Sequence, residues 1–326
     1  MNNEGIKRAA LWEKPKIVSF LNENWGDNHR LVNNETFFNY YYLDGENINF
    51  YYLEEEGKIA AICGYIKCSQ SPHSDIWVSI WCAKKGKNGL GLALMGAMQS
   101  LTGANVMACN NIRENTLPFY NFLGYYPGKM QHYYRLNDLE KYNIAVVNNK
   151  NILPCTKADG VVLKEFRSIA ELQQAFPLDS VCAPHKDYWY LNKRYFNNPY
   201  LSYIVLGLYQ NNACVSLVVF RVNKGEEGNV LRLVDYVGAP HNFELLNGWV
   251  DVLLQQLCCE YCDMYSVGVN GGSAGFSLLC DGDTNILPNY LNPILQENID
   301  YFYFTTHQQD FMMFKADGDQ DRKNIF

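Results

Sequence analysis

The sequence of 326 residues lacks any apolar run long enough to cross a membrane, and its first residues are polar. Because a membrane-spanning helix needs about 20 mostly apolar residues, we expect neither a membrane span nor a signal peptide. The sequence also lacks a basic tract, and its 27 Lys and Arg against 34 Asp and Glu give a net charge of −7. Nucleic acid is therefore not expected as a partner. Together these absences favour a cytoplasmic protein that acts on small molecules.

The eleven cysteines lack the spacing of a metal site. Cys258, Cys259 and Cys262 fall in residues 245–262, which the apolar spacing predicts to be one helix. Several other cysteines fall in apolar segments that read as strands. This distribution favours buried free thiols over disulfides or zinc ligands, so no metal is expected.

Length and composition favour two domains. Hydrophobic residues make up 48% of the chain, enough to fill sizeable cores, and domains of roughly 150 residues are typical. Residues 137–160 are polar, rich in Asn and Lys, and contain Pro154, so we interpret them as a connection that can include an edge strand. We place the domains at 1–145 and 146–326.

A strand, a glycine-rich turn and a helix follow one another in the first half. Residues 76–82 are apolar and aromatic, which is typical of a half-buried strand. After the turn at 84–91, four apolar residues line one face of a helix: Leu90, Leu94, Ala97 and Leu101. The helix dipole and the lysines of the turn favour an anion, and the turn's glycines let the backbone approach it. A pyrophosphate fits this pattern, although ordinary strand–turn–helix connections also show it.

A second pattern follows this helix. Residues 105–110 are typical of a strand, and residues 115–125 of a short helix that ends in Gly124-Tyr125. Together the two patterns resemble the GNAT superfamily of acyl-CoA-dependent N-acetyltransferases. Its pyrophosphate turn matches residues 86–91, with Gly86 where the family has Arg or Gln, and its second signature matches residues 115–125. The resemblance covers roughly residues 17–136, and residues 126–136 are expected to complete this first unit with a strand.

The resemblance implies acyl-CoA as a cosubstrate and assigns roles to residues in both motifs. The strand main chain would hold the pantetheine arm, the turn would hold the pyrophosphate, and Lys85 and Lys87 would replace the charge missing at Gly86. Tyr120 would protonate the departing CoA thiolate. The cofactor-binding residues are then Ile80, Trp81, Cys82, Lys85, Lys87, Asn88, Gly89, Leu90, Gly91 and Asn115.

The family also places the first helix–loop–helix over the acceptor site. Residues 17–24 predict the first helix, and residues 35–43 are either a second helix or an extended segment. The loop between them contains Trp25 and His29. Because histidine titrates near neutral pH, His29 is our candidate for general base or acceptor contact. The alternative is a histidine of a surface loop or of a helix N-cap.

The second half repeats the order of the first. A hairpin at 203–222, a strand at 230–236, the helix at 245–262 and a strand at 265–269 follow one another. We align Leu231 with Trp77 and Asp235 with Trp81, so Asp235 would face the acyl group, cap a strand or pair with Arg232. The phosphate turn does not recur. The expected fold class is therefore α+β, with two tandem GNAT-like domains, each a mixed β-sheet flanked by helices, and one acyl-CoA site.

The C-terminal segment has alternating acidic residues, Asp317, Asp319 and Asp321, followed by Arg322. The spacing starts like a calcium loop, but Arg322 stands where such a loop needs Gly. One alternative is a flexible acidic tail. Because residues 311–314 are typical of a buried strand, we expect the acidic residues to be held at its end.

These features carry a narrower resemblance. Trp25 with His29, the Asp-Tyr-x-Gly of residues 235–238, Ala274-Gly-Phe276 and the acidic terminus are similar to two-domain GNAT proteins of bacterial surface-polysaccharide (O-antigen, lipopolysaccharide and capsule) synthesis. Lys323 departs from the Pro that such tails often have. The resemblance implies transfer of an acetyl or short hydroxyacyl group, such as 3-hydroxybutanoyl, to the amine of a nucleotide-linked amino sugar, for example a dTDP-3-amino-3,6-dideoxyhexose. Its substrate-binding residues would be Trp25, Asp235, Asp317, Asp319 and Arg322. The alternatives are a GNAT enzyme for a hydroxyl, amino acid or peptide, and a non-catalytic binding protein.

Overall fold

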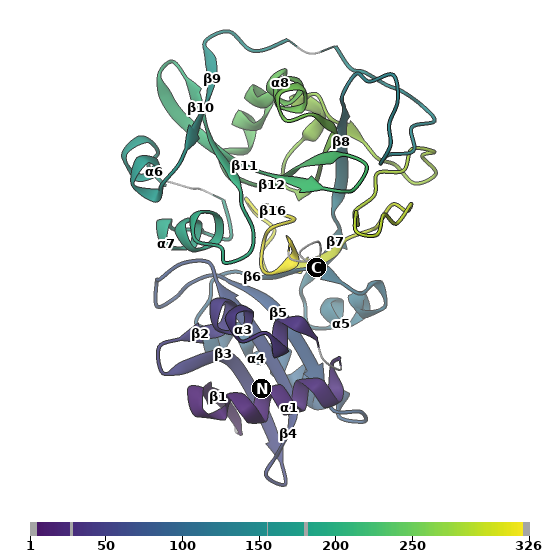
Figure 1. Cartoon of the computed structure of the whole chain (residues 1–326). Helices are drawn as coiled ribbons and strands as arrows, with labels where there is room; N and C mark the ends of the chain where they lie inside the picture. The colour runs from purple at the N-terminus through teal and green to yellow at the C-terminus, as the bar shows by residue number, and fades with distance from the viewer. Residues whose placement is uncertain (1–4, 27–28, 155, 179–181, 322–326) are drawn as a thin grey trace.

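The computed structural model describes residues 5–26, 29–154, 156–178 and 182–321. These residues form two mixed β-sheets with flanking helices, one below the other in Figure 1. The α+β class and the pair of mixed-sheet units expected from the sequence are confirmed.

The first sheet has the strand order β1-β3-β4-β5-β6-β15-β7, and β2 pairs with β3 at its side. All neighbours are antiparallel except β5 and β6, which are parallel. Its strands are β1 Ile6–Ala10, β2 Leu43–Asp44, β3 Asn47–Glu55, β4 Lys58–Lys67, β5 Ile76–Ala83, β6 Met107–Ile112, β7 Tyr126–Lys129 and β15 Phe302–Thr305.

The second sheet has the order β9-β10-β11-β12-β13-β8-β14, and β16 pairs with β13. Its β12 and β13 are again the parallel pair. Position by position, this order corresponds to that of the first sheet. Its strands are β8 Gln131–Leu136, β9 Val161–Phe166, β10 Ile204–Gln210, β11 Ala213–Lys224, β12 Asn229–Gly238, β13 Cys259–Val267, β14 Ser277–Leu278 and β16 Met313–Phe314.

Each sheet takes its sixth strand from the other half of the chain. β8 follows directly after β7 but pairs with β13 and β14 in the second sheet. β15 returns from the second half to pair with β6 and β7 in the first. The expectation that residues 126–136 complete the first unit is therefore wrong for 131–136. Apolar alternation indicates a strand but not its partner, which long-range contacts select.

Helices cover both faces of the first sheet. On one face α4 packs against β4 and β5 together with Tyr120 of α5, while α1 and α3 contribute to the core on the other face. Of residues 35–43, which the sequence left open between helix and extended segment, 35–42 form the helix α3 and Leu43 begins β2. The helices include α1 Lys14–Asn24, α2 Arg30–Asn33, α3 Glu35–Tyr42, α4 Asn88–Thr102, α5 Leu117–Phe122, α6 Ile169–Ala175, α7 Tyr188–Leu191 and α8 Trp249–Gln256, with single turns such as η2 Glu114–Thr116 and η3 Asn192–Phe196.

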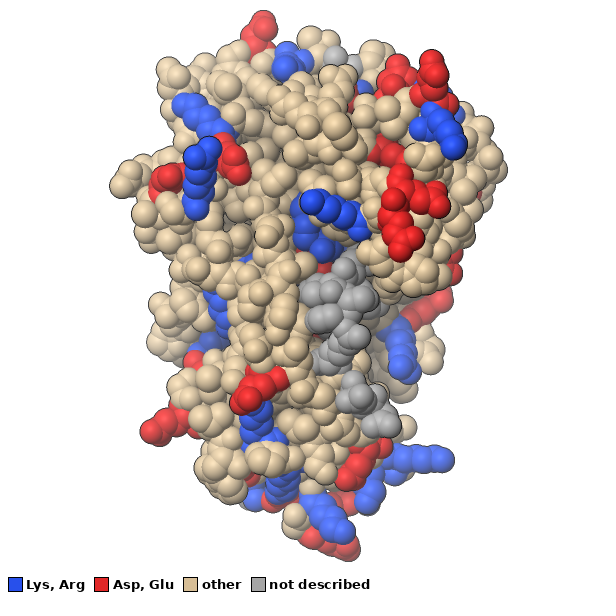
Figure 2. Space-filling view, viewed as in Figure 1, with Lys and Arg blue, Asp and Glu red and all other residues tan. Residues whose placement is uncertain are grey.

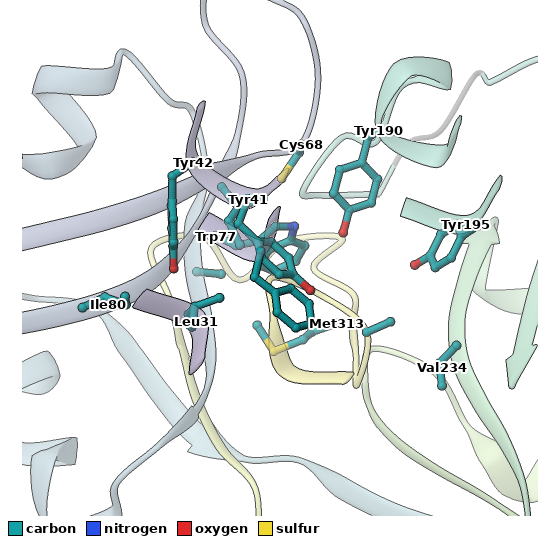
Figure 3. Close-up of a cluster of buried hydrophobic side chains, with 14 of the residues drawn as sticks. Leu31, Tyr41, Tyr42, Cys68, Trp77, Ile80, Tyr190, Tyr195, Val234 and Met313 are labelled. Atoms are coloured by element: carbon teal, nitrogen blue, oxygen red, sulfur yellow. The ribbon is translucent and has the colours of Figure 1, made fainter. Parts of the chain in front are cut away.

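A single apolar cluster joins the two sheets. It contains Phe38 and Tyr42 from α3, Tyr195 and Val234 from the second sheet's side, and Met313 from the C-terminal segment. Figure 3 shows Tyr42 and Ile80 on one side of this cluster, Tyr195 and Val234 on the other, and Met313 between them. The C-terminal segment, yellow in Figure 1, thus lies at the junction of the two sheets.

Residues 245–262 are not one helix. The helix α8 ends at Gln256, Cys258 has a left-handed φ of 51°, and β13 begins at Cys259. Cys259 and Cys262 therefore lie on a strand that is almost wholly buried. Such a strand reads as a continuous apolar run and cannot be told from a helix by spacing alone. The cysteines of the described residues are free thiols.

The long connection between β8 and β9 has an isolated bridge, Val146 to Ile286, but no strand within its described residues. In the described part of the chain no helix is long and apolar enough to span a membrane. Figure 2 shows acidic and basic side chains intermixed over one face of the molecule.

Candidate active site

The first sheet opens between β5 and β6. These strands pair only at Ile76 with Met107 and at Trp77 with Ala108, and the described chain has no further pair between them. On its other edge β5 continues to pair with β4 as far as Ala83. The backbone groups of Ile80, Trp81 and Cys82 on the open edge therefore have no partner strand. We call this opening the first wedge.

Ser79 is an extra residue in β5 just inside the first wedge. Gly64 of β4 pairs with Ile80 while Tyr65 pairs with Val78, so Ser79 has no opposite residue. Such a β-bulge bends the strand and redirects its side chains. The bulge therefore contributes to the divergence of β5 from β6.

The glycine-rich turn leads from β5 into α4 at the end of the wedge. Gly86 has a φ of +83°, which favours glycine, and the N-cap Lys87 makes no side-chain cap. The backbone N–H groups of Asn88 and Gly89, in the first turn, have no preceding helical carbonyl to bond. They can bind an anion there. Lys85 is exposed, whereas Lys87 pairs with Glu55, Nζ to Oε2 at 2.6 Å.

Gly91 lets α4 lie directly against β5. A Cβ at Gly91 would stand 2.9 Å from Cβ of Ala83, whereas at Gly89 it would meet nothing within 4 Å. The indole Nε1 of Trp81 donates to the carbonyl of Gly91 at 2.9 Å. The two glycines of one motif thus differ, because Gly91 serves helix–strand packing and Gly89 borders open space.

Tyr120 lies beside the wedge on the α4 face. Its ring stacks on Phe304 at 4.3 Å between centroids and lies 5.8 Å from that of Trp81. Burial raises the pKa of Tyr120, and Cys109 adds to the shift, so the phenol keeps its proton at neutral pH. Phe304 belongs to β15, so the second half of the chain supplies one wall of this site. Asn115 is exposed in η2.

His29 caps the short helix α2. Its carbonyl accepts from the backbone N–H of Val32 and Asn33, and its Nδ1 accepts from the N–H of Leu31 at 3.2 Å. Its ring lies 4.3 Å from that of Trp25. Leu31 is buried in the cluster at the sheet junction, and Figure 3 draws it toward the same side of the cluster as Tyr42 and Ile80. The loop therefore borders the junction, with one imidazole nitrogen engaged in a cap.

The second sheet opens in the same place, but its opening is filled. Val234 is the extra residue of a bulge in β12, as Ser79 is in β5. Between β12 and β13, β16 pairs Phe314 with Ser266 and Met313 with Val267. The N–H of Ala316 then donates to the carbonyl of Val234 at 2.9 Å. We call this filled opening the second wedge.

The two bulges correct the sequence alignment by one residue. They match Val234 with Ser79, so Asp235 corresponds to Ile80 rather than Trp81 and lies on the opposite face. Asp235 is fully buried and accepts from Lys186 Nζ at 2.6 Å and from the hydroxyl of Tyr195. Its cation is thus Lys186 and not Arg232.

Lys186 also pairs with Asp317 of the C-terminal segment at 2.6 Å. Burial raises the pKa of Asp317 to about 7, with Lys186 opposing the shift and Asp235 adding to it. The acidic segment is therefore not a solvated tail. Asp317, Asp319 and Asp321 are each about 1% exposed. The described residues contain no metal-binding group of three His, Cys, Asp or Glu.

Asp319 reaches the first wedge. Its Oδ2 accepts from Ser79 Oγ at 2.9 Å, and Ser79 Oγ lies 2.6 Å from the hydroxyl of Tyr42. Next to it, Gln320 Oε1 accepts from Asn111 of β6 at 2.7 Å. Arg322, the remaining substrate-binding candidate, lies outside the described residues.

Sequence reasoning missed a group of buried donors on the second sheet. Arg221 of β11 and Arg232 of β12 stand directly opposite each other, and the Nε of each has no hydrogen-bond partner among the described residues. Within the same residues the side chain of Asn223 has no hydrogen-bond partner either. Burial, reinforced by Arg232, lowers the pKa of Lys315 well below its usual value. Opposed arginines and unpaired donors favour an acceptor-rich ligand. Charged residues inside otherwise apolar strands were the available signal.

Comparisons with known proteins support the fold. No family model matches the chain, and no curated protein does. Among solved structures, a GCN5-related N-acetyltransferase from Anabaena variabilis aligns with a TM-score of 0.55 at 11% identity, covering 92% of this chain and 71% of that one. A protein from Enterococcus faecalis described as a "probable N-acyltransferase" aligns with a TM-score of 0.54 at 12% identity, covering 92% and 71%. The chain therefore has the fold of GCN5-related N-acetyltransferases over most of its length.

Proposed function

We propose that the protein is an acyl-CoA-dependent N-acyltransferase with one CoA site per chain, at the first wedge. The observation that carries this proposal is the open edge of β5 leading to the uncapped first turn of α4, with Tyr120 beside it. The open edge offers backbone partners to a pantetheine arm. The turn offers N–H groups and Lys85 to a pyrophosphate.

The residues around the wedge support a direct transfer from CoA to an amine. The N–H groups of the open edge of β5 would stabilise the oxyanion formed when an amine attacks the thioester carbonyl. Tyr120, protonated at neutral pH, would give a proton to the departing thiolate. His29, next to Trp25 in the loop at the junction, is one candidate to take the proton of the amine.

We further propose that the acceptor is a nucleotide-linked amino sugar, with a dTDP-3-amino-3,6-dideoxyhexose as the first choice. An acetyl or a 3-hydroxybutanoyl group would be transferred, as in the synthesis of bacterial surface polysaccharides. Two features support this choice: the carboxylates of residues 317–321 suit sugar hydroxyls and an amine, and the donors of Arg221 and Asn223 suit a diphosphate. Asp235 and Asp317 would contribute by holding the segment in place, and Arg322 stays a substrate-binding candidate from the sequence.

The test measures thiol release and product mass with acetyl-CoA or 3-hydroxybutanoyl-CoA and the dTDP-linked amino sugar. Acylation of the amine, lost when the amine is replaced by a hydroxyl, is the expected result. Arg221→Gln should raise the KM for the nucleotide sugar several-fold and leave CoA affinity unchanged. Transfer to an amino acid or peptide but not to the sugar would overturn the acceptor assignment. Absence of CoA binding would overturn the whole proposal.

A further inference from the structure

The C-terminal segment is bonded to both walls of the first wedge. Ser79 of β5 donates to Asp319, Asn111 of β6 donates to Gln320, and Nδ2 of Asn110 of β6 lies 3.2 Å from the carbonyl of Phe314 and 3.3 Å from that of Asp317. These contacts join residues more than 200 positions apart in the sequence. They fix one carboxylate, that of Asp319, where β5 and β6 begin to diverge.

Asp319 and Tyr120 lie on opposite faces of β5. Tyr120 packs with Trp81 in the core on the α4 face. Asp319 bonds to Ser79, whose hydroxyl also touches Tyr42 of α3, on the face covered by α1 and α3. A transferase needs its acid on the side of the departing thiolate and its base on the side of the amine. At the proposed site CoA would enter along the turn before α4, which would put the thiolate on the face of Tyr120.

The carboxylate of Asp319 is also held in place. Its Oδ1 accepts from Gln320 Nε2 at 2.6 Å, while Gln320 is itself anchored to Asn111. The rival base, His29, uses its Nδ1 to cap α2. Because Asp319 is fixed where β5 and β6 diverge, it can contact the amine without any movement of the loop that contains His29.

We propose that Asp319 is the general base of the acyl transfer, a role that rests on the proposed function. The carboxylate takes one proton from the bound ammonium and keeps it during the transfer, which frees the nitrogen lone pair. As the C–N bond forms and the C–S bond breaks, Tyr120 protonates the thiolate, and the second nitrogen proton passes through water to the tyrosinate. The carboxyl releases its proton to solvent when the products leave.

The test is the pH dependence of Asp319→Asn, with acetyl-CoA and the dTDP-linked amino sugar. An amine with a pKa of roughly 8 is about 3% neutral at pH 6.5 and about 90% neutral at pH 9. The variant can use only the neutral amine, so its loss of kcat/KM relative to wild type should shrink about 30-fold over this range. Asp321→Asn is the matched control, because Asp321 lies on the same segment but pairs with Arg221 and Tyr203. Any loss of kcat/KM in Asp321→Asn, relative to wild type, should be the same at every pH.

Three results would overturn the proposal. An unchanged rate in Asp319→Asn, or a loss equal at all pH values, would leave Asp319 a structural role. A pH-dependent loss in His29→Asn alone would move the base to His29.

If the amino sugar does not react, a structure with a non-reactive acetyl-CoA analogue decides whether Asp319 can be the base. The acyl carbon should lie within about 7 Å of the carboxylate, the sum of a hydrogen bond and an attack distance, and a longer separation excludes the role. Failure of CoA binding in wild type would instead refute the proposed function.

Discussion

The two wedges occupy the same position in two sheets of the same order, yet they differ in what fills them. In the first, β5 and β6 separate after Trp77, and a glycine-rich turn follows. In the second, β12 and β13 separate after Arg232, and β16 enters the opening. The N–H of Ala316 bonds the bulge residue Val234. The second wedge thus has its strand edge partnered by the chain itself, and the same segment then continues to the first wedge.

The largest expected effect of a single substitution lies at the first wedge. Tyr120→Phe should lower kcat by about 10²–10⁴ if proton donation limits the rate. The phenyl ring keeps its stacking on Phe304, so the melting temperature should change little. Steady-state kinetics with a melting curve measures both. An unchanged kcat would assign the acid to another group.

A substitution at the second wedge should instead lower the stability of the fold. Phe314 is fully buried where β16 enters the opening, and Phe314→Ala should lower the free energy of unfolding by about 3–5 kcal/mol. Urea unfolding measures the change, and Phe122→Ala is the control, because Phe122 is 73% exposed. Equal stability of the two variants would contradict the account of β16 as a packed filling.

Substitutions at two glycines of the first turn of α4 should distinguish helix–strand packing from ligand binding. Gly91→Ala places a Cβ 2.9 Å from Ala83, which displaces the first turn of α4. We expect about a tenfold weaker affinity for acetyl-CoA, since the donors of the turn move with it. Gly89→Ala should weaken the affinity for acetyl-CoA less, because its Cβ would meet no atom within 4 Å. A larger loss of affinity in Gly89→Ala would indicate that the ligand needs the space at position 89 more than β5 needs the glycine at position 91.

The last substitution tests how the pH dependence of stability depends on Asp317, which fixes the segment between the wedges. Its folded-state pKa is about 7, above the value of about 3.9 expected in the unfolded chain. Its contribution to stability is therefore present below pH 4 and lost as the pH rises through 7. Asp317→Asn should remove this decline, seen as a flatter unfolding free energy between pH 4.5 and 7.5. If the unfolding free energy of Asp317→Asn declines with pH as steeply as that of wild type, another group causes the decline.

The sequence predicted the parts of the site that depend on neighbouring residues. The strand before Gly86, the helix after it and the short helix around Tyr120 all form close to their expected bounds. The exchange of β8 and β15 could not be predicted, because short strands carry no record of their distant partners. The burial of Asp317 and Asp319 was equally hidden, since their partners Lys186 and Ser79 lie far away in the sequence. Only the apolar residues 311–314 indicated that the segment is held.

The central claim is that one wedge binds CoA and the other is closed by the chain itself. Titration calorimetry of the full chain with acetyl-CoA tests it most directly. We predict one site per chain, weakened in Gly91→Ala. Two sites per chain, or a single site unaffected by that substitution, would contradict the account.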